Sequence, residues 1–411
     1  MHILWVKTEL LHPVDKGGRI RTYNMLRALR REHRITYVTL DDGHAAPDAA
    51  ERASEYADHV VRVPFGAAPK RSARFYGELA ANLFSPLPYA IAKYRSAGLR
   101  RAIVDLVAKG DVDVVVCDFL APSLNVPAGL PVRTVLFQHN VEAMIWRRHA
   151  EVARGALARR YFREQWRRMD AFERAECRRF DHVIAVSAED RDVFRSAYGV
   201  AGATDVPTGV DVDFFRPSGT VAREPLDMVF TGSMDWLPNE DGILWFTDEI
   251  LPRIRARVPG ATLTVVGRNP PARIRALAER DPMVRVTGTV PDVRPYIERA
   301  AVFVVPLRIG GGTRLKIFEA MAMERAVVST AVGAEGLPVN DGADILLADA
   351  PEAFAAAVAG LLEQPARAES LGGAAARLVR ASFGWDRVAD IFADQCALAA
   401  GERPITPTGR S

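Results

Sequence analysis

The strongest structural signal in the chain is the stretch Val302-Phe-Val-Val-Pro-Leu-Arg-Ile-Gly310-Gly-Gly-Thr-Arg-Leu-Lys-Ile-Phe-Glu-Ala-Met-Ala322. Its β-branched and aromatic start predicts a strand that is buried on both faces. Three glycines then predict a turn, and a helix is expected to open around Thr313. A strand that passes through a glycine turn into a helix is the repeating unit of a parallel α/β sheet.

The same alternation extends over the whole chain, and a stretch of linker composition lies at 216–225. The pattern predicts an α/β protein made of two doubly wound, Rossmann-like domains. Their expected bounds are 1–205 and 206–383, followed by a C-terminal helix at about 384–400 and a loose tail at 401–411. The predicted strands are 2–7, 35–40, 59–63, 112–117, 134–138, 183–186, 227–231, 262–266, 284–286, 302–306, 327–330 and 345–347.

Composition narrows the class of protein. Of 411 residues, 49% are hydrophobic and 26% are charged, which is typical of a globular chain. The three cysteines (Cys117, Cys177 and Cys396) are too far apart for a CxxC metal site or a disulfide framework. No apolar run of about 18 residues occurs. We therefore expect a cytoplasmic protein without a membrane span.

Charge is unevenly distributed. Residues 1–205 hold 32 Lys and Arg against 25 Asp and Glu, whereas the remainder holds 22 against 26. A long helical stretch at 145–180 contributes 11 of these arginines. Two interpretations stay open for it: a solvated helix face, or a peripheral contact with an anionic membrane surface.

The glycine loop at 310–313 predicts a phosphate site, because free amides at a helix start attract anions. Arg314 and Lys316 place cations in the first helical turn, where the helix dipole disfavours them unless an anion compensates. Glu319 follows on an otherwise apolar helix, and its carboxylate suits the hydroxyls of a ribose or sugar.

A second glycine turn, Gly17-Gly18, follows the first strand, at the position where open α/β sheets bind ligands. His139 ends the strand 134–138, so it can exchange a hydrogen bond with a substrate hydroxyl or phosphate. Together the two glycine loops predict a ligand held between two domains.

Several function classes lack their signatures. The sequence has no GxxxxGK[ST], no GxGxxG and no GxSxG, which disfavours P-loop enzymes, dinucleotide oxidoreductases and serine hydrolases. Two D-x-D triplets, 111–113 and 211–213, are common by chance, and we expect no metal site. The acidic balance of the second half disfavours nucleic-acid binding.

Together these stretches resemble the glycosyl transferase group 1 family, retaining nucleotide-sugar enzymes of the GT-B fold. The match is best over 226–331, where Phe230-Thr-Gly-Ser-Met-Asp235, Pro238-Asn239 and Val290-Pro-Asp-Val-Arg-Pro-Tyr296 are similar to sugar transferases of exopolysaccharide gene clusters. The resemblance implies two Rossmann-like domains facing a central cleft, with a C-terminal helix crossing back to the first domain.

The resemblance also implies roles for residues at matching positions. Glu319 would hold the ribose of the donor, Gly312 and Thr313 would give amides to its distal phosphate together with Gly17 and Gly18, and the segment ending at Val290 would flank the base. His139 would be catalytic, contacting the donor sugar. No cofactor is implied, since the nucleotide sugar is a substrate.

Two departures from the family pattern stand out. Gly311 occupies the position of the first glutamate of the E-x7-E motif. The usual Arg and Lys after the first strand of the second domain are replaced by Gly232, Ser233 and Asn239. Arg268, Arg314 and Lys316 are the candidates that would bind the diphosphate instead.

The sequence therefore predicts a metal-independent, retaining hexosyltransferase that moves a sugar from a nucleotide-diphosphate donor to a glycan or lipid-linked acceptor in surface polysaccharide synthesis. A GT-B-fold sugar-nucleotide epimerase and a non-catalytic nucleotide-sugar-binding protein remain as alternatives.

Overall fold

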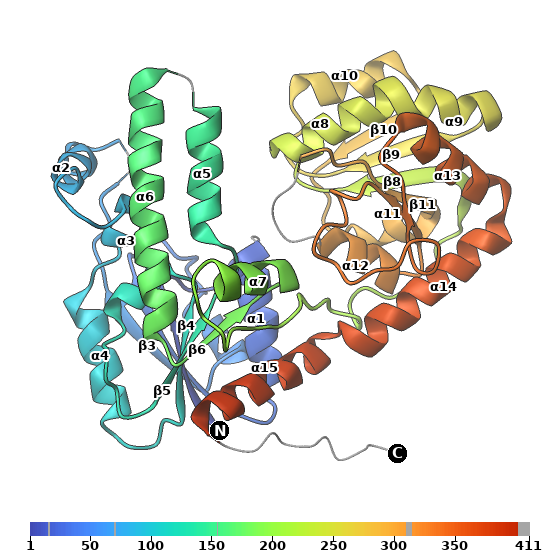
Figure 1. Ribbon diagram of the computed structural model, residues 1–411. Coiled ribbons are helices and arrows are strands. Elements are labelled where there is room, and N and C mark those ends of the chain that lie inside the picture. Colours follow the sequence, from blue (N-terminus) through green and yellow to red (C-terminus); the bar gives the residue numbers. More distant parts are fainter. Residues whose placement is uncertain (15–16, 70, 154, 310–314, 402–411) are drawn as a thin grey trace. The chain divides into compact units, whose positions relative to one another are not determined.

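A computed structural model describes residues 1–14, 17–69, 71–153, 155–309 and 315–401 (Figure 1). The chain divides into two compact units. The first contains Met1–Pro207 and the segment from Val388 onwards, and the second contains Thr208–Arg387. Gly219 donates its backbone N–H to Glu298 Oε1 at 2.7 Å, so the stretch at 216–225 is tied to the second unit.

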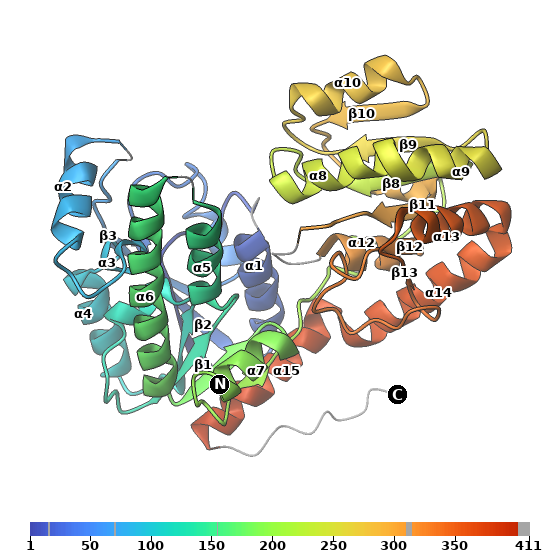
Figure 2. The ribbon, with the colours of Figure 1, turned by 45° about the horizontal axis from the view of Figure 1, so that its top comes forward.

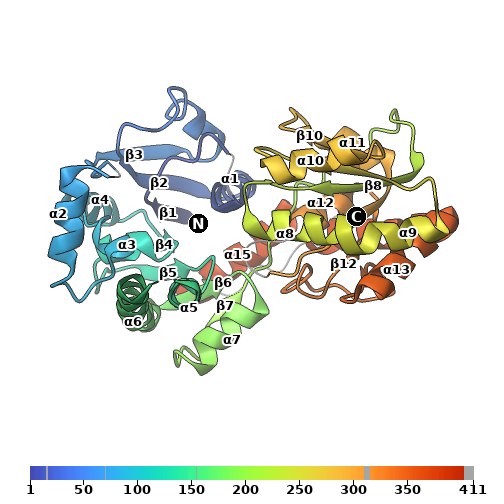
Figure 3. The ribbon, with the colours of Figure 1, turned by 90° about the horizontal axis from the view of Figure 1, so that it is seen from above.

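The first unit is built on a seven-stranded parallel sheet in the order β3-β2-β1-β4-β5-β6-β7. Figure 3 shows the strands side by side in this order. Successive side chains of β1 point to opposite faces of the sheet, as the two-residue period of a strand requires. Leu4 and Val6 join a core with Leu99 and Ile103. The strands are β1 (His2–Lys7), β2 (Arg34–Asp41), β3 (His59–Pro64), β4 (Val114–Asp118), β5 (Arg133–Phe137), β6 (His182–Ala185) and β7 (Thr204–Asp205).

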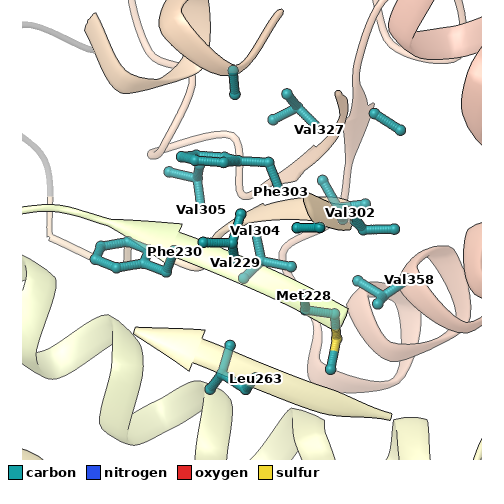
Figure 4. Packing of buried hydrophobic residues seen from close by; sticks show 14 of the residues in the cluster. Met228, Val229, Phe230, Leu263, Val302, Phe303, Val304, Val305, Val327 and Val358 are labelled. Atoms are coloured by element: carbon teal, nitrogen blue, oxygen red, sulfur yellow. The ribbon is translucent and has the colours of Figure 1, made fainter. Parts of the chain in front are cut away.

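The second unit contains a six-stranded parallel sheet in the order β10-β9-β8-β11-β12-β13. Its core includes Met228, Phe230, Phe303 and Val327, which are fully buried between sheet and helices (Figure 4). The strands are β8 (Glu224–Thr231), β9 (Thr262–Val266), β10 (Val284–Gly288), β11 (Ala300–Val305), β12 (Ala326–Ser329) and β13 (Leu346–Leu347).

Helices connect the strands in both units. The helices of the first unit are α1 (Gly17–Leu29), η1 (Arg52–Glu55), α2 (Ala73–Asn82), α3 (Tyr89–Ala92), α4 (Ala97–Val107), η2 (Ala121–Asn125), α5 (Glu142–Val152), α6 (Ala156–Arg179) and α7 (Ala188–Ser196). Those that follow are α8 (Leu237–Trp245), η3 (Phe246–Ile250), α9 (Leu251–Arg257), α10 (Ala272–Arg280), α11 (Arg294–Arg299), α12 (Leu315–Ala322), α13 (Pro351–Glu363), α14 (Pro365–Ser382) and α15 (Trp385–Ala400). Within the described residues, no helix is both long and apolar enough to cross a membrane.

The C-terminal helix α15 starts in the second unit and continues into the first. Its Phe392 packs on Trp5 and Phe137, with ring centroids 5.4 and 4.9 Å apart. The helix therefore contributes directly to the core of the first unit, as expected.

All twelve predicted strands are present within three residues of their expected bounds, whereas the two-residue β7 was not predicted. The helical stretch expected at 145–180 is present. It is two helices, α5 and α6, that lie side by side (Figure 2). Gly155 precedes α6 with φ 90°, a conformation that helical residues do not adopt, and its lack of a side chain permits the turn.

Candidate functional site

In the first unit, a buried polar cluster surrounds Asp118 at the end of β4. Asp118 Oδ2 accepts hydrogen bonds from Lys7 Nζ at 2.6 Å, Thr22 Oγ1 at 2.6 Å and Trp5 Nε1 at 3.1 Å. Burial alone would raise the pKa of Asp118, but the charge of Lys7 and the hydrogen bonds from Lys7 and His139 hold it well below its ordinary range. Asp118 is therefore an ionised carboxylate inside the protein.

His139 follows β5 and is bound to the same carboxylate. Its Nε2 lies 2.7 Å from Asp118 Oδ1. Burial, with the charges of Arg21 and Lys7, lowers the pKa of His139 well below its ordinary value, against the opposing charge of Asp118. The imidazole is therefore neutral near pH 7.

Aromatic rings hold the imidazole in place. Phe119 stacks on His139 with centroids 3.7 Å apart and planes 18° from parallel, and Phe137 packs beside it at 4.6 Å. Gly18 makes this stack possible, since a Cβ at that position would lie 2.8 Å from Phe119 Cζ. The glycine turn thus brings the start of α1 against the histidine.

Arg21, one turn into α1, is a second buried cation near this cluster. Its side chain is 2% exposed and its guanidinium has no hydrogen-bond partner among the described residues. Burial lowers the pKa of Arg21 to about 10, with the charges of Asp118 and Asp190 opposing, so the group keeps its charge at neutral pH.

In the second unit, a polar cluster lies at the end of β8. Lys316 Nζ, from the first turn of α12, donates to Asn239 Oδ1 at 2.8 Å and sits 4.2 Å from the centroid of Phe230. Gly232 leaves room for this approach, since a Cβ there would meet Asn239 Nδ2 at 2.7 Å and Lys316 Nζ at 2.8 Å. An ammonium group is therefore held tightly against a glycine turn.

Ser233 extends this cluster toward β9. Its carbonyl accepts from Asn239 Nδ2 at 2.9 Å, and its hydroxyl accepts from Arg268 Nε at 2.8 Å. Arg268 is exposed on the loop after β9. Lys316 and Arg268 thus place two cations at adjacent strand ends, an arrangement that can neutralise a diphosphate.

Glu319 lies one turn after Lys316 on α12. Burial raises the pKa of Glu319 to about 7, and the charge of Lys316 opposes this shift. Within the described residues its carboxylate receives no hydrogen bond. A partly buried carboxylate of this kind gains from hydroxyl donors on a ligand.

Both units of the chain match known glycosyltransferase families. Residues 225–364 match the sequence profile of the family described as glycosyl transferases group 1, and residues 16–214 match the profile of glycosyltransferase family 4. The second unit therefore carries a region that matches glycosyl transferases group 1, and the first unit carries a region that matches glycosyltransferase family 4.

Two relatives of the chain are named mannosyltransferases. The GDP-mannose-dependent alpha-(1-6)-phosphatidylinositol monomannoside mannosyltransferase of Mycobacterium tuberculosis is 31% identical over 236 residues, which cover 52% of this chain and 61% of the relative. The chain therefore spans less than two thirds of that relative. A lipopolysaccharide core biosynthesis mannosyltransferase of Rhizobium leguminosarum is 27% identical, over 60% of this chain and 75% of the relative.

Among solved structures, Anabaena HepE in complex with UDP-glucose superposes with a TM-score of 0.59 at 13% identity, covering 97% of this chain and all of the other. This likeness shows the fold. The α/β architecture of two Rossmann-like domains expected for this GT-B family is confirmed.

Apart from Val290, the predicted site residues fall into three groups. Gly232, Ser233, Asn239, Arg268 and Lys316 come together as one cluster, with Glu319 on the same helix as Lys316. Gly17 begins α1, and Gly18 lies against the ring that stacks on His139. Gly311, Gly312, Thr313 and Arg314 lie outside the described residues.

Val290 lies two residues after the end of β10, the strand beside β9. Gly288, two residues earlier, accepts a hydrogen bond from Gly267 N, next to Arg268, at 3.2 Å. The half-buried Val290 packs against the core of the second unit. It therefore lies one strand away from the cation cluster.

The D-x-D triplets have structural roles. Asp113 Oδ2 accepts from His2 N at 2.6 Å, and Asp211 Oδ1 accepts from Phe214 N at 2.9 Å. In the described part of the chain, no group of three or more His, Cys, Asp or Glu side chains is placed to hold a metal ion.

Sequence reasoning missed the residues around His139: Lys7, Arg21, Thr22 and Asp118. Two of them carried a recognisable signal. Lys7 and Asp118 are charged residues that end apolar strands, and the carboxyl ends of parallel strands meet at one edge of a sheet.

Proposed function

We propose that this chain is a retaining, metal-independent glycosyltransferase. It moves a hexose from a nucleotide-diphosphate sugar to a hydroxyl of a glycan or lipid-linked acceptor in surface polysaccharide synthesis. The observation that carries the proposal is the cation cluster at the end of β8, where Lys316 is held by Asn239 against Gly232. A diphosphate leaving group needs its negative charge stabilised, and fixed cations supply this stabilisation.

The related proteins support this proposal in different ways. One relative is named for GDP-mannose and a phosphatidylinositol acceptor, another for lipopolysaccharide core synthesis, and the fold neighbour was solved with UDP-glucose. GDP-mannose is therefore the first donor to test, and UDP-glucose the second.

The test of donor binding is thermal stability in the presence of UDP-, GDP-, ADP- and dTDP-sugars without added metal. A donor at 100 times its Kd adds about 2.7 kcal/mol to the free energy of unfolding. We expect a shift with one nucleotide class, and we expect Glu319→Ala to lose it. No shift with any donor contradicts the proposed site.

Turnover then separates the alternatives. Release of the nucleoside diphosphate together with a glycosylated acceptor supports a transferase. A changed sugar released without an acceptor identifies an epimerase. Binding without turnover identifies a nucleotide-sugar-binding protein, which the glycine at position 311 makes worth testing.

We also propose peripheral association of the first unit with the anionic inner face of the cell membrane. Phe84 and Leu157 are 93% and 86% exposed. Arg168 of α6 donates to the backbone carbonyls of Asn82 and Leu83 at 2.6 and 3.0 Å, which holds the end of α2 beside α6. A hollow of about 850 Å³ lies here, lined by apolar side chains, by Glu164 and Asp170, and by five arginines, among them Arg160 and Arg163. Exposed apolar groups beside cations suit a surface of anionic lipid.

Vesicle sedimentation tests this contact. Each surface arginine contributes about 1 kcal/mol to binding of anionic lipid, so Arg160→Gln/Arg163→Gln is expected to weaken partitioning about 30-fold. The matched control is Arg275→Gln/Arg280→Gln, which removes the same charge from α10 of the second unit. Equal loss in both variants, or no binding by the wild type, contradicts a surface on α6.

A further inference from the structure

The hydrogen bonds around Asp118 determine which nitrogen of His139 carries the proton. An ionised carboxylate only accepts hydrogen bonds. Asp118 already accepts from Lys7, Thr22 and Trp5 through Oδ2, and these donors stabilise its negative charge. The contact at 2.7 Å between Oδ1 and His139 Nε2 therefore requires that Nε2 is the donor.

The ring is fixed in this orientation. Phe119 stacks on one face of His139 and Phe137 packs beside it, while Asp118 is fully buried and His139 is 6% exposed. Phe119 is itself held in place by Lys7, whose Nζ lies 4.2 Å from the centre of its ring. Rotation of the imidazole would break the bond to Asp118 and leave a buried carboxylate oxygen without a donor, which is costly.

The other ring nitrogen is then an acceptor. Among the described residues, Nδ1 of His139 has no hydrogen-bond partner. The charged groups that act on the ring are Asp118, Arg21 and Lys7, and the two cations disfavour a second proton. A neutral imidazole with Nε2 protonated offers a lone pair at Nδ1.

We propose that Asp118 is a positioning residue that keeps His139 protonated at Nε2, so that Nδ1 meets the substrate as a hydrogen-bond acceptor. The partner that this geometry selects is a hydroxyl group of the sugar or acceptor, because a phosphate oxygen without a proton offers Nδ1 no donor. His139 in this state binds a hydroxyl and does not protonate the leaving diphosphate. The inference rests on the proposed function for its substrate, but the tautomer can be measured without any substrate.

The first experiment is nitrogen NMR of protein labelled with ¹⁵N-histidine, with His139→Gln used to assign the signal among the eight histidines. At pH 7.5 we expect Nδ1 of His139 to resonate as an unprotonated nitrogen and Nε2 as a protonated one. A protonated Nδ1 in the wild type overturns the proposal, whether or not Nε2 is also protonated.

Two variants test whether Asp118 sets the tautomer. In Asp118→Asn the amide can donate to Nε2, so we expect the proton to move to Nδ1. Thr22→Val removes one donor to Oδ2 but leaves the bond between Oδ1 and His139, so we expect no change of tautomer. An unchanged tautomer in Asp118→Asn overturns the role of Asp118. If that variant does not fold, the wild-type spectrum still decides the protonation of the ring.

A second experiment links the tautomer to the substrate. GDP-mannose and UDP-glucose are compared with analogues in which one hydroxyl is replaced by fluorine, which accepts but does not donate. For one position, we expect the wild type to turn over the fluoro analogue about 5- to 150-fold less efficiently, the range for a lost hydrogen bond that leaves a buried acceptor unpaired. Asp118→Asn should lose most of this discrimination. Equal discrimination in both proteins overturns the assignment of Nδ1 as the acceptor. Absence of any turnover refutes the proposed function and leaves the NMR result standing by itself.

Discussion

Lys316→Met is expected to weaken donor binding about 10- to 150-fold, measured as the Kd of the donor that produces the largest thermal shift. Hydrogen bonds to charged groups contribute about 1.5–3 kcal/mol each, which corresponds to this range of Kd. Methionine preserves the apolar packing on Phe230 but removes the ammonium group. The loss should therefore appear in donor binding, in addition to a destabilisation of about 1–3 kcal/mol, because the buried Asn239 Oδ1 loses its donor.

Two further variants separate charge from packing. Arg257→Met removes a cation of the same unit that is paired with Glu363, and it should bind donor like the wild type. Gly232→Ala keeps Lys316 but forces Nζ and Asn239 away from the turn, so it should weaken binding as well. If Lys316→Met binds donor as tightly as Arg257→Met, the cluster at the end of β8 does not hold the diphosphate.

The fold could be predicted from the sequence because parallel strands buried on both faces leave a strong local signature. The run at 302–305 predicts a strand from its own residues alone, because all of them are β-branched or aromatic. Its neighbours β8 and β12 also contain apolar, β-branched runs. The helix break at Gly155 could not be predicted in this way. The arginine-rich pattern on both sides of it continues without interruption, and one glycine inside a helical pattern is often tolerated.

The cation cluster of the second unit was partly predictable. Because Arg and Lys are absent after β8, the sequence offers three other cations as candidates for a diphosphate site, and Lys316 is one of them. Its contact with Asn239 depends on how α12 packs beside the end of β8. Lys316 and Asn239 are 77 positions apart in the sequence, so no local sequence pattern indicates that they meet.

The cluster of the first unit was harder to predict for the same reason. His139 was singled out by its place at a strand end. However, its partner Asp118 belongs to another strand, and Lys7 comes from a third. Only the strand order β1-β4-β5 brings the three ends together, and this order is a property of the sheet rather than of any segment.

Lys7→Met is expected to destabilise the first unit by about 3–5 kcal/mol, the typical cost of removing one partner of a buried ion pair. Lys7 Nζ and Asp118 Oδ2 lie 2.6 Å apart, and their side chains are 3% and 0% exposed. Without the ammonium group, the carboxylate is left buried with fewer donors. Calorimetry should show the transition of this unit roughly 6–20 °C lower, since 1 kcal/mol corresponds to about 2–4 °C for a domain of this size.

The double variant Lys7→Met/Asp118→Asn makes this prediction specific to the ion pair. It removes both charges together, so it should recover much of the stability that either single variant loses, and the coupling between the two positions should be at least about 1 kcal/mol.

The stability lost with Asp118 also depends on pH. A carboxyl whose pKa is held low in the folded state contributes its stability above the pKa of the unfolded chain, and loses it as the pH falls through the folded value. The difference between wild type and Asp118→Asn should therefore shrink in acid. Additive losses in the double variant, with no change of this difference in acid, would show that Lys7 and Asp118 contribute packing rather than charge.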